Sequence, residues 1–187
     1  LANSGLESHG INLTSITIDV RRMLQRKEKI VSGLTKGVES LFKLNKVESI
    51  LGEASVPEKG KVVVQEPSGN TVTLSSDNII IATGARAKWF LGMEPDGKQI
   101  FTYKEAMIPE KQPKSLVIIG AGAIGVEFAH FYQTFGTEVT LIEALPNILP
   151  IEDEDISVEL EKFFKKRKMN ILTNTIVDKI EKLIESK

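Results

Sequence analysis

Apolar residues recur every three or four positions between residues 17 and 43, with charged residues such as Arg21 and Lys29 between them. This spacing places the apolar side chains on one face of a helix and the charged side chains on the other. Asp19 lies in the first turn, where a carboxylate complements the helix dipole. The pattern predicts a long amphipathic helix, preceded by a polar loop over residues 1–13.

The period of the pattern shortens to two between residues 46 and 82, which indicates a small antiparallel β-meander. Strands are expected at residues 47–51, 61–65, 71–75 and 79–82, with turns at the proline and glycine groups 57–60 and 67–70. The last strand is wholly apolar and leads into Thr83 and Gly84. That arrangement is typical of a buried strand that opens into a backbone turn.

An irregular linker is expected after the meander, because proline and glycine recur there: Gly92, Pro95, Gly97, Pro109 and Pro113. One short helical turn is expected within it, around residues 103–107. A domain boundary falls in this segment. The predicted organisation is a first domain over residues 1–85, a linker over 86–112 and a second domain over 113–187.

An apolar strand at residues 116–119 runs directly into a glycine-rich turn and then a helix that ends at Gly136, an expected left-handed cap. Gly120, Gly122 and Gly125 have the spacing of a dinucleotide-binding fingerprint. The first glycine makes the tight turn, the second lets the backbone approach a pyrophosphate, and the third allows close packing of helix and strand. The helix N-terminus would stabilise the pyrophosphate through its free N–H groups and its dipole.

Glu143 follows a second apolar strand at residues 139–142, about twenty residues beyond the glycines. At that place this fold needs an acidic group that accepts hydrogen bonds from the ribose hydroxyls. A 2′-phosphate would be repelled by this carboxylate, and no lysine or arginine lies between Gly120 and Pro150. The residues therefore favour NAD over NADP as the ligand.

Acidic residues 152–155 precede a further amphipathic helix, and basic residues 165–168 end it. Each run complements the nearer end of the helix dipole, which explains both runs without a metal site or a nucleic-acid site. A third parallel strand is expected at residues 171–173, whereas residues 176–184 fit a strand and a helix equally. The order predicts an α/β fold in which residues 113–187 form the nucleotide-binding half of a doubly wound, Rossmann-like sheet.

Composition excludes several classes of function for this chain of 187 residues with a formal net charge of −1. No apolar run can span a bilayer, and the charge balance favours neither a nucleic-acid nor a membrane partner. The absence of cysteine excludes disulfides, thiolate zinc sites and thiol catalysis by these residues. We expect His130 to be a packing or surface residue, and His9 has no identifiable partner. Because the chain begins with Leu1, we expect it to be a piece of a longer protein.

The strand that ends at Thr83 and Gly84, followed at domain spacing by the Gly120 fingerprint and Glu143, resembles flavoproteins of the pyridine nucleotide-disulfide oxidoreductase family. Residues 34–47 and 148–155 are similar to the branch that reoxidises the dihydrolipoyl groups of 2-oxo acid dehydrogenase complexes. The resemblance covers essentially the whole chain. It implies part of an FAD-binding domain over residues 1–85, consisting of the long helix and the meander, and an NAD-binding domain that is incomplete at its C-terminus.

The resemblance also assigns cofactor contacts residue by residue. Beside FAD it places Gly52, Ala54, Thr83, Gly84 and Ala85, where the family usually has serine at the last position. Along the pyrophosphate of NAD and towards the nicotinamide it places Gly120, Ala121, Gly122, Ala123, Ile124, Gly125, Val126 and Glu127. It places Glu143 at the adenosine ribose and Val177 beside the adenine.

In the family, electrons pass from a dihydrolipoyl thiol pair to an enzyme disulfide, then to FAD and then as hydride to NAD. The resemblance implies a cytoplasmic homodimer when intact, with lipoylated subunits of 2-oxo acid dehydrogenase complexes as partners. This chain lacks the family's redox cysteines, flavin fingerprint and catalytic His-Glu pair. We therefore assign no catalytic or metal-binding residue and expect an inactive chain that binds NAD without flavin. Two alternatives stay open, namely a related disulfide or mercuric reductase and a non-catalytic NAD-binding module.

Overall fold

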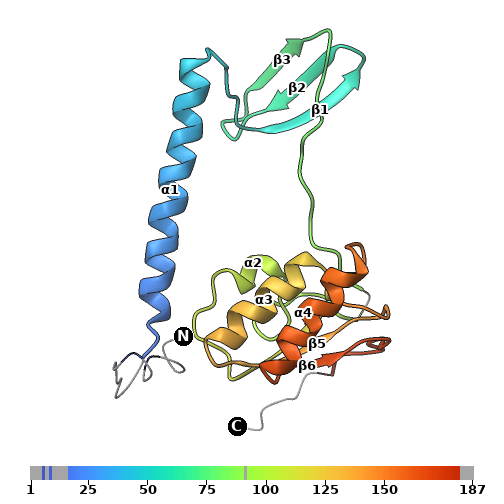
Figure 1. Ribbon diagram of the computed structural model, residues 1–187. Helices are drawn as coiled ribbons and strands as arrows, with labels where there is room; N and C mark the ends of the chain where they lie inside the picture. The colour runs from blue at the N-terminus through green and yellow to red at the C-terminus, as the bar shows by residue number, and fades with distance from the viewer. Residues whose placement is uncertain (1–5, 7–8, 10–16, 91, 182–187) are drawn as a thin grey trace. The chain divides into compact units, whose positions relative to one another are not determined.

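The computed structural model describes residues 6, 9, 17–90 and 92–181, which form two compact units (Figure 1). One unit is Gln25–Arg86, and the other consists of the described residues of Leu1–Leu24 and Ala87–Lys187. The predicted α/β class is confirmed, because one three-stranded sheet is antiparallel and the other is parallel and carries helices. The domain boundaries given above stay a prediction.

Helix α1, Val20–Leu44, confirms the long amphipathic helix. Asp19 was expected in the first turn, but it lies just before the helix, where its Oδ1 accepts a hydrogen bond from the Arg22 N–H at 3.0 Å and caps the N-terminus. No residue of α1 is buried, and Leu34 on its apolar face is 67 % exposed. Of the loop predicted over residues 1–13, only residues 6 and 9 are described, and His9 is exposed.

Strands β1 (Glu53–Glu58), β2 (Lys61–Gln65) and β3 (Thr71–Ser75) form the antiparallel sheet in that order. The second and third strands match their predicted bounds. The turn between them contains Gly69 with φ +88°, and the turn between β1 and β2 contains Gly60 with φ +77°. Both glycines adopt the left-handed conformation that tight turns require and that side chains disfavour.

The strand predicted at residues 47–51 is wrong, because pairing with β2 begins only at Glu53. The strand that does form includes Pro57, which the sequence pattern had placed in a turn. Strand β1 lies at the edge of its sheet, and its register shifts between Ser55 and Glu58. A proline is tolerated at such an edge irregularity, since no ladder hydrogen bond needs its missing N–H.

The buried strand predicted at residues 79–82 is also wrong. These residues form neither a strand nor a helix, and Ile80 and Ile81 are 91 % and 76 % exposed. A continuous apolar run becomes a buried strand when neighbouring strands pair with it and other elements cover it. No strand in the described residues pairs with this run.

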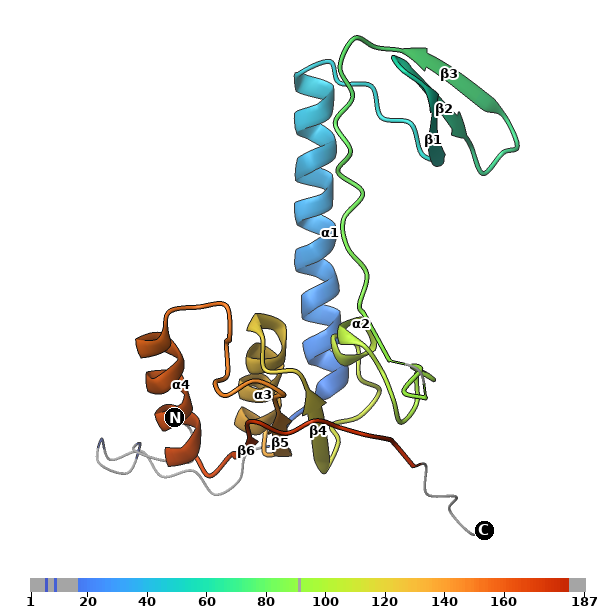
Figure 2. The ribbon, with the colours of Figure 1, turned by 90° about the vertical axis from the view of Figure 1, so that its right-hand side faces the viewer.

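The second unit contains the elements α2 (Tyr103–Ala106), β4 (Ser115–Ile119), α3 (Ala123–Thr134), β5 (Glu138–Ile142), α4 (Glu154–Lys166) and β6 (Asn170–Leu172). The strands are parallel in the order β4-β5-β6, and α3 and α4 lie side by side over one face of the sheet (Figure 2). The predicted β-α-β-α-β order and short helical turn are confirmed. Residues 176–181 form neither strand nor helix, and 182–184 lie outside the described residues.

The core of this unit lies between the sheet and the two helices. Val139 and Leu141 of β5 are 3 % and 0 % exposed and pack with Tyr132 of α3 and Phe164 of α4. The alternate residues point to the other face, where Val117 of β4 is 59 % exposed. Helices α3 and α4 thus cover one face of this sheet, as in one half of a doubly wound sheet.

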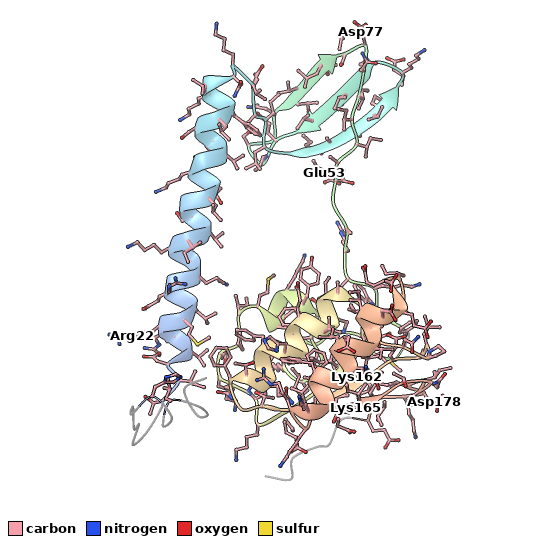
Figure 3. All side chains as sticks on the ribbon, in the orientation of Figure 1. Arg22, Glu53, Asp77, Lys162, Lys165 and Asp178 are labelled. Atoms are coloured by element: carbon pink, nitrogen blue, oxygen red, sulfur yellow. The ribbon has the colours of Figure 1, made fainter. Side chains whose placement is uncertain are left out.

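A capping aspartate precedes α4, and a glycine follows the end of α3. Asp153 Oδ1 accepts a hydrogen bond from the Asp155 N–H at 3.0 Å, so the acidic run caps α4. Lys162 and Lys165 lie on α4 (Figure 3) and pair with carboxylates of the same helix, Glu159 and Glu161. Helix α3 ends before Gly136, whose φ of +94° confirms the left-handed cap.

The Tyr132 hydroxyl ties α3 to α2 by donating a hydrogen bond of 2.7 Å to the Ala106 carbonyl. Burial raises the pKa of Tyr132, so the phenol keeps the proton that it donates. We expect Tyr132→Phe to lower the free energy of unfolding by about 1–2 kcal/mol, because a buried carbonyl loses its partner. Urea unfolding followed by circular dichroism measures this loss. Tyr103→Phe is the control, and an equal loss in both variants would contradict the assignment.

Candidate dinucleotide-binding site

Strand β4 passes into helix α3 through a turn that only glycine suits. Gly120 has φ +100°, a conformation in which any side chain would be strained. Its N–H donates to the Ile142 carbonyl at 2.8 Å, which continues the pairing of β4 with β5 beyond the last strand residue. The turn therefore begins at the carboxyl ends of two adjacent parallel strands, where open α/β sheets bind ligands.

The other two glycines of the fingerprint meet different surroundings. A Cβ atom on Gly125 would lie 2.0 Å from the Gly120 carbonyl oxygen, so helix and turn touch at this position. A Cβ atom on Gly122 would have no heavy atom within 4 Å. Close packing thus explains the glycine at 125, and it leaves the glycine at 122 unexplained unless a ligand approaches there.

The N-terminus of α3 carries no side-chain cap. Gly122 is its N-cap and makes no side-chain hydrogen bond, whereas Thr102 caps α2 and Asp153 caps α4. The first N–H groups of a helix have no partner within the helix, and an anion satisfies them well. Of the residues assigned to this region, Ala123, Ile124 and Glu127 are exposed, while Ala121 and Val126 are buried.

Glu143 is 9 % exposed, and its carboxylate is held between two backbone N–H groups. Oε2 accepts from Ala121 at 2.8 Å, and Oε1 accepts from Leu145 at 3.0 Å. The Glu143 backbone is bonded as well, to the Leu172 carbonyl at 2.8 Å and to the Thr175 N–H at 2.9 Å. A carboxylate has about four acceptor positions, so acceptor capacity remains for the two hydroxyls of a ribose.

The segment that follows β6 is hydrogen-bonded to the backbone of Glu143 and Leu145. The Asn174 N–H donates to the Leu145 carbonyl at 3.0 Å, and the neighbouring Thr175 N–H bonds to Glu143 as described above. Val177, assigned to the adenine, comes shortly afterwards and is half-buried. The structure therefore brings the glycine turn, Glu143 and the approach to Val177 together.

The residues assigned to FAD all lie in Gln25–Arg86. A Cβ atom on Gly52 would lie 2.5 Å from the Gln65 carbonyl oxygen, so packing against β2 already explains this glycine. Ala54 of β1 is exposed, as are Thr83, Gly84 and Ala85 in an irregular segment. Among the described residues, one buried side-chain polar atom has no hydrogen-bond partner, Gln133 Oε1, and it lies in the parallel-sheet unit. Within Gln25–Arg86, therefore, no unpartnered buried polar side chain marks a place for FAD. The FAD assignments rest on the family resemblance.

Two residues beside the turn, Leu149 and Ser157, make hydrogen bonds that the sequence pattern does not predict. The Leu149 N–H donates to the Ala121 carbonyl at 2.7 Å, and the Ser157 hydroxyl donates to the Leu149 carbonyl at 3.2 Å. Ser157 shares a helix stripe with Leu160 and Phe164, both of which pack in the core. A polar residue within such an apolar stripe could have indicated a buried hydrogen bond.

His130 is exposed and lies beside the rings of Phe163 and Phe164, with centroid distances of 5.9 Å and 6.5 Å. This confirms the packing or surface role expected for it. Within the part of the chain that the structure describes, no group of three or more His, Cys, Asp or Glu residues could hold a metal ion. None of the described helices is both long and apolar enough to cross a membrane.

The chain is similar in sequence to one known family and to several named proteins. The pyridine nucleotide-disulphide oxidoreductase family model matches residues 4–185. The chain is 40 % identical over 182 residues to a dihydrolipoyl dehydrogenase of Rhizobium etli, with 90 % of the chain covered. It is 39 % identical over 174 residues to a dihydrolipoyl dehydrogenase of Zymomonas mobilis, with 93 % covered.

Among solved structures, the fold is similar to that of the HOCl-induced flavoprotein disulfide reductase RclA of Escherichia coli. The TM-score is 0.76 and the identity is 28 %, with 90 % of this chain covered. The chain spans 38 % of that protein and 38 % and 37 % of the two dehydrogenases. It thus corresponds to little more than a third of each of these proteins.

Proposed function

Because the chain belongs to the pyridine nucleotide-disulphide oxidoreductase family, we propose that its parallel-sheet unit binds NAD at the glycine turn and Glu143. The observation that carries this proposal is the fixed Glu143 carboxylate, which is bonded to the Ala121 N–H of the turn and keeps acceptor capacity for a ribose diol. The uncapped N-terminus of α3 suits the pyrophosphate, which would approach over Gly122. Val177 would border the adenine.

The same carboxylate supports a preference for NAD over NADP. Glu143 is buried and has no cationic partner among the described ion pairs. A phosphate on the 2′-hydroxyl would bring a second negative charge against it, which costs free energy in a site of low dielectric constant. No lysine or arginine between Gly120 and Pro150 could balance that charge.

For the intact protein we propose the activity of the dihydrolipoyl dehydrogenases that it resembles. In that reaction a dihydrolipoyl dithiol is oxidised to a disulfide, and its two electrons reach NAD through an enzyme disulfide and FAD. The cofactors supply the electron transfer, and these residues position NAD. The chain has no cysteine, so the thiol-disulfide step needs residues outside these 187. A cytoplasmic homodimer that serves lipoylated 2-oxo acid dehydrogenase subunits is part of the same proposal.

Isothermal titration of the chain with NAD and with NADP tests which of the two dinucleotides binds. We expect NAD to bind and NADP to bind at least about tenfold more weakly, because the 2′-phosphate meets the Glu143 carboxylate. We also expect the purified chain to show no flavin absorbance, since the chain lacks the flavin fingerprint of the family. Absence of NAD binding overturns the proposed site, and bound flavin overturns the second expectation.

Gly122→Ala separates binding from folding at the turn. The added methyl group has no neighbour within 4 Å, so we expect the free energy of unfolding to fall only by the difference between glycine and alanine as an N-cap, about 1 kcal/mol or less. The methyl group would project where the pyrophosphate approaches, so the NAD dissociation constant should rise by about tenfold or more. Calorimetric titration and urea unfolding measure the two quantities. Unchanged affinity would show that no ligand approaches Gly122.

A second candidate for the intact protein is a disulfide reductase with a different substrate. The similarity to the Escherichia coli flavoprotein disulfide reductase favours it. Both candidates share the dinucleotide site, and the substrate is chosen elsewhere in the protein. Steady-state assays of the full-length protein with dihydrolipoamide and NAD, set against disulfide substrates and NADH, distinguish the two.

A further inference from the structure

We propose that Ser157 is a positioning residue for the dinucleotide site and that it acts through Leu149 and Ala121. This inference rests on the proposed binding of NAD. Ser157 lies on α4, outside the glycine fingerprint, and nothing assigned so far gives it a role. Its side chain connects the helix to the glycine turn through a short series of buried hydrogen bonds.

The hydrogen bonds run from the ribose-binding carboxylate to α4. Glu143 Oε2 accepts from the Ala121 N–H at 2.8 Å, and the Ala121 carbonyl accepts from the Leu149 N–H at 2.7 Å. The Leu149 carbonyl then accepts from the Ser157 hydroxyl at 3.2 Å. Ala121 is therefore held from both sides, by Glu143 through its N–H and by Leu149 through its carbonyl.

Every residue of this series is shielded from water. Ala121 is 0 % exposed and Ser157 is 2 % exposed, while Leu149 and Glu143 are each 9 % exposed. Hydrogen bonds in such surroundings are stronger than those at the surface, and losing one costs more. Water therefore cannot replace a hydrogen bond lost at Ser157, and we expect the loss to alter the position of Ala121.

Ser157 adds a side-chain link between α4 and the turn that begins at Leu149. The Leu149 carbonyl also accepts from the Glu152 N–H at 3.0 Å, which closes the turn over residues 149–152. The Ser157 hydroxyl is also within hydrogen-bond distance of the Asp153 carbonyl, at 3.3 Å, but that contact stays at the N-terminus of its own helix. The bond to Leu149 is thus the contribution of the hydroxyl that joins the turn to α4.

Leu149 has a strained backbone that needs this support. Its φ of +48° lies in the left-handed region, which is unfavourable for a leucine. Residues in such conformations persist when the surrounding structure holds them in place. Without the Ser157 hydroxyl we expect Leu149 to relax, and its N–H then moves away from the Ala121 carbonyl. Ala121 and the Glu143 carboxylate lose their fixed spacing as a result.

The test compares Ser157→Ala with Thr137→Val, because each removes one buried hydroxyl. Thr137 is 3 % exposed and donates to the Pro113 carbonyl at 2.8 Å, before the start of β5 and far from the end that carries Glu143. NAD affinity is measured by isothermal titration on the whole chain, and stability by urea unfolding. Hydrogen exchange of the Ala121 and Leu149 amides is measured by NMR without ligand.

We expect Ser157→Ala to weaken NAD binding by about threefold to tenfold, the effect of one misplaced hydrogen bond. Exchange of the Ala121 and Leu149 amides should be faster in this variant. Thr137→Val should lose comparable stability but should change neither the NAD affinity nor the exchange of the Ala121 and Leu149 amides. If Ser157→Ala loses stability but keeps its NAD affinity and its amide exchange, Ser157 is merely structural and the inference is overturned. If the unsubstituted chain fails to bind NAD, the proposed function is overturned, and the exchange data still report on the positioning of Ala121.

Discussion

Replacing Gly125 with alanine is expected to lower the free energy of unfolding of the parallel-sheet unit by about 3 kcal/mol or more. The added Cβ would lie 2.0 Å from the Gly120 carbonyl oxygen, far inside van der Waals contact. The obstacle is backbone and cannot rotate away as a side chain could. To accept the methyl group, α3 must separate from the turn, and the core residues Ala129 and Tyr132 would move with it.

Urea unfolding monitored by circular dichroism measures this loss, and Gly122→Ala is the matched control. Both variants add one methyl group to the same fingerprint, but only the one at 125 meets an atom. We expect a large decrease in the unfolding midpoint for Gly125→Ala and a much smaller one for the control, in which alanine replaces the N-cap glycine of α3. If the two midpoints are equal, the contact between helix and turn does not exist in solution.

Glu143→Ala should produce the largest loss of affinity among changes that leave the fold intact. The carboxylate is the proposed acceptor for both ribose hydroxyls, and hydrogen bonds to a charged group contribute about 1.5–3 kcal/mol each. Two such bonds correspond to an increase in the NAD dissociation constant of about 100-fold or more. The variant also releases the Ala121 N–H, so the turn should become less ordered.

Isothermal titration with NAD measures the effect, with Glu138→Ala as the control. Glu138 begins the same strand, is exposed and lies at the opposite end of β5 from the site. Its replacement should leave NAD affinity within about twofold. A loss below about threefold for Glu143→Ala would place the ribose elsewhere, and equal losses in both variants would point to a general effect of charge.

Helices and the glycine fingerprint were predictable from the sequence because their signals are local. The long helix required only an apolar period and a capping Asp19, and the turn required only the spacing of its glycines. The two wrong strands, at residues 47–51 and 79–82, depend on partners. An apolar run such as Ile80 and Ile81 indicates that burial would be favourable. It does not indicate whether another strand is present to pair with it.

The site was predictable where a residue type is needed for its own chemistry. A carboxylate at 143 and glycines at 120 and 125 are what the proposed dinucleotide and a tight turn would need. Leu149 could not be found this way, since it acts through its backbone, and the apolar stripe around Ser157 indicates a buried hydroxyl but not its partner. Their roles appear only when α4 is folded against the glycine turn.

The two backbone bonds of the Glu143 carboxylate have a consequence for the entropy of binding. A free glutamate side chain loses about 1.5–2 kcal/mol of rotamer entropy when it is ordered. Here Ala121 and Leu145 order it before any ligand arrives, so this loss accompanies folding and not association. A preorganised acceptor of this kind favours affinity by about tenfold over a mobile one that makes the same hydrogen bonds.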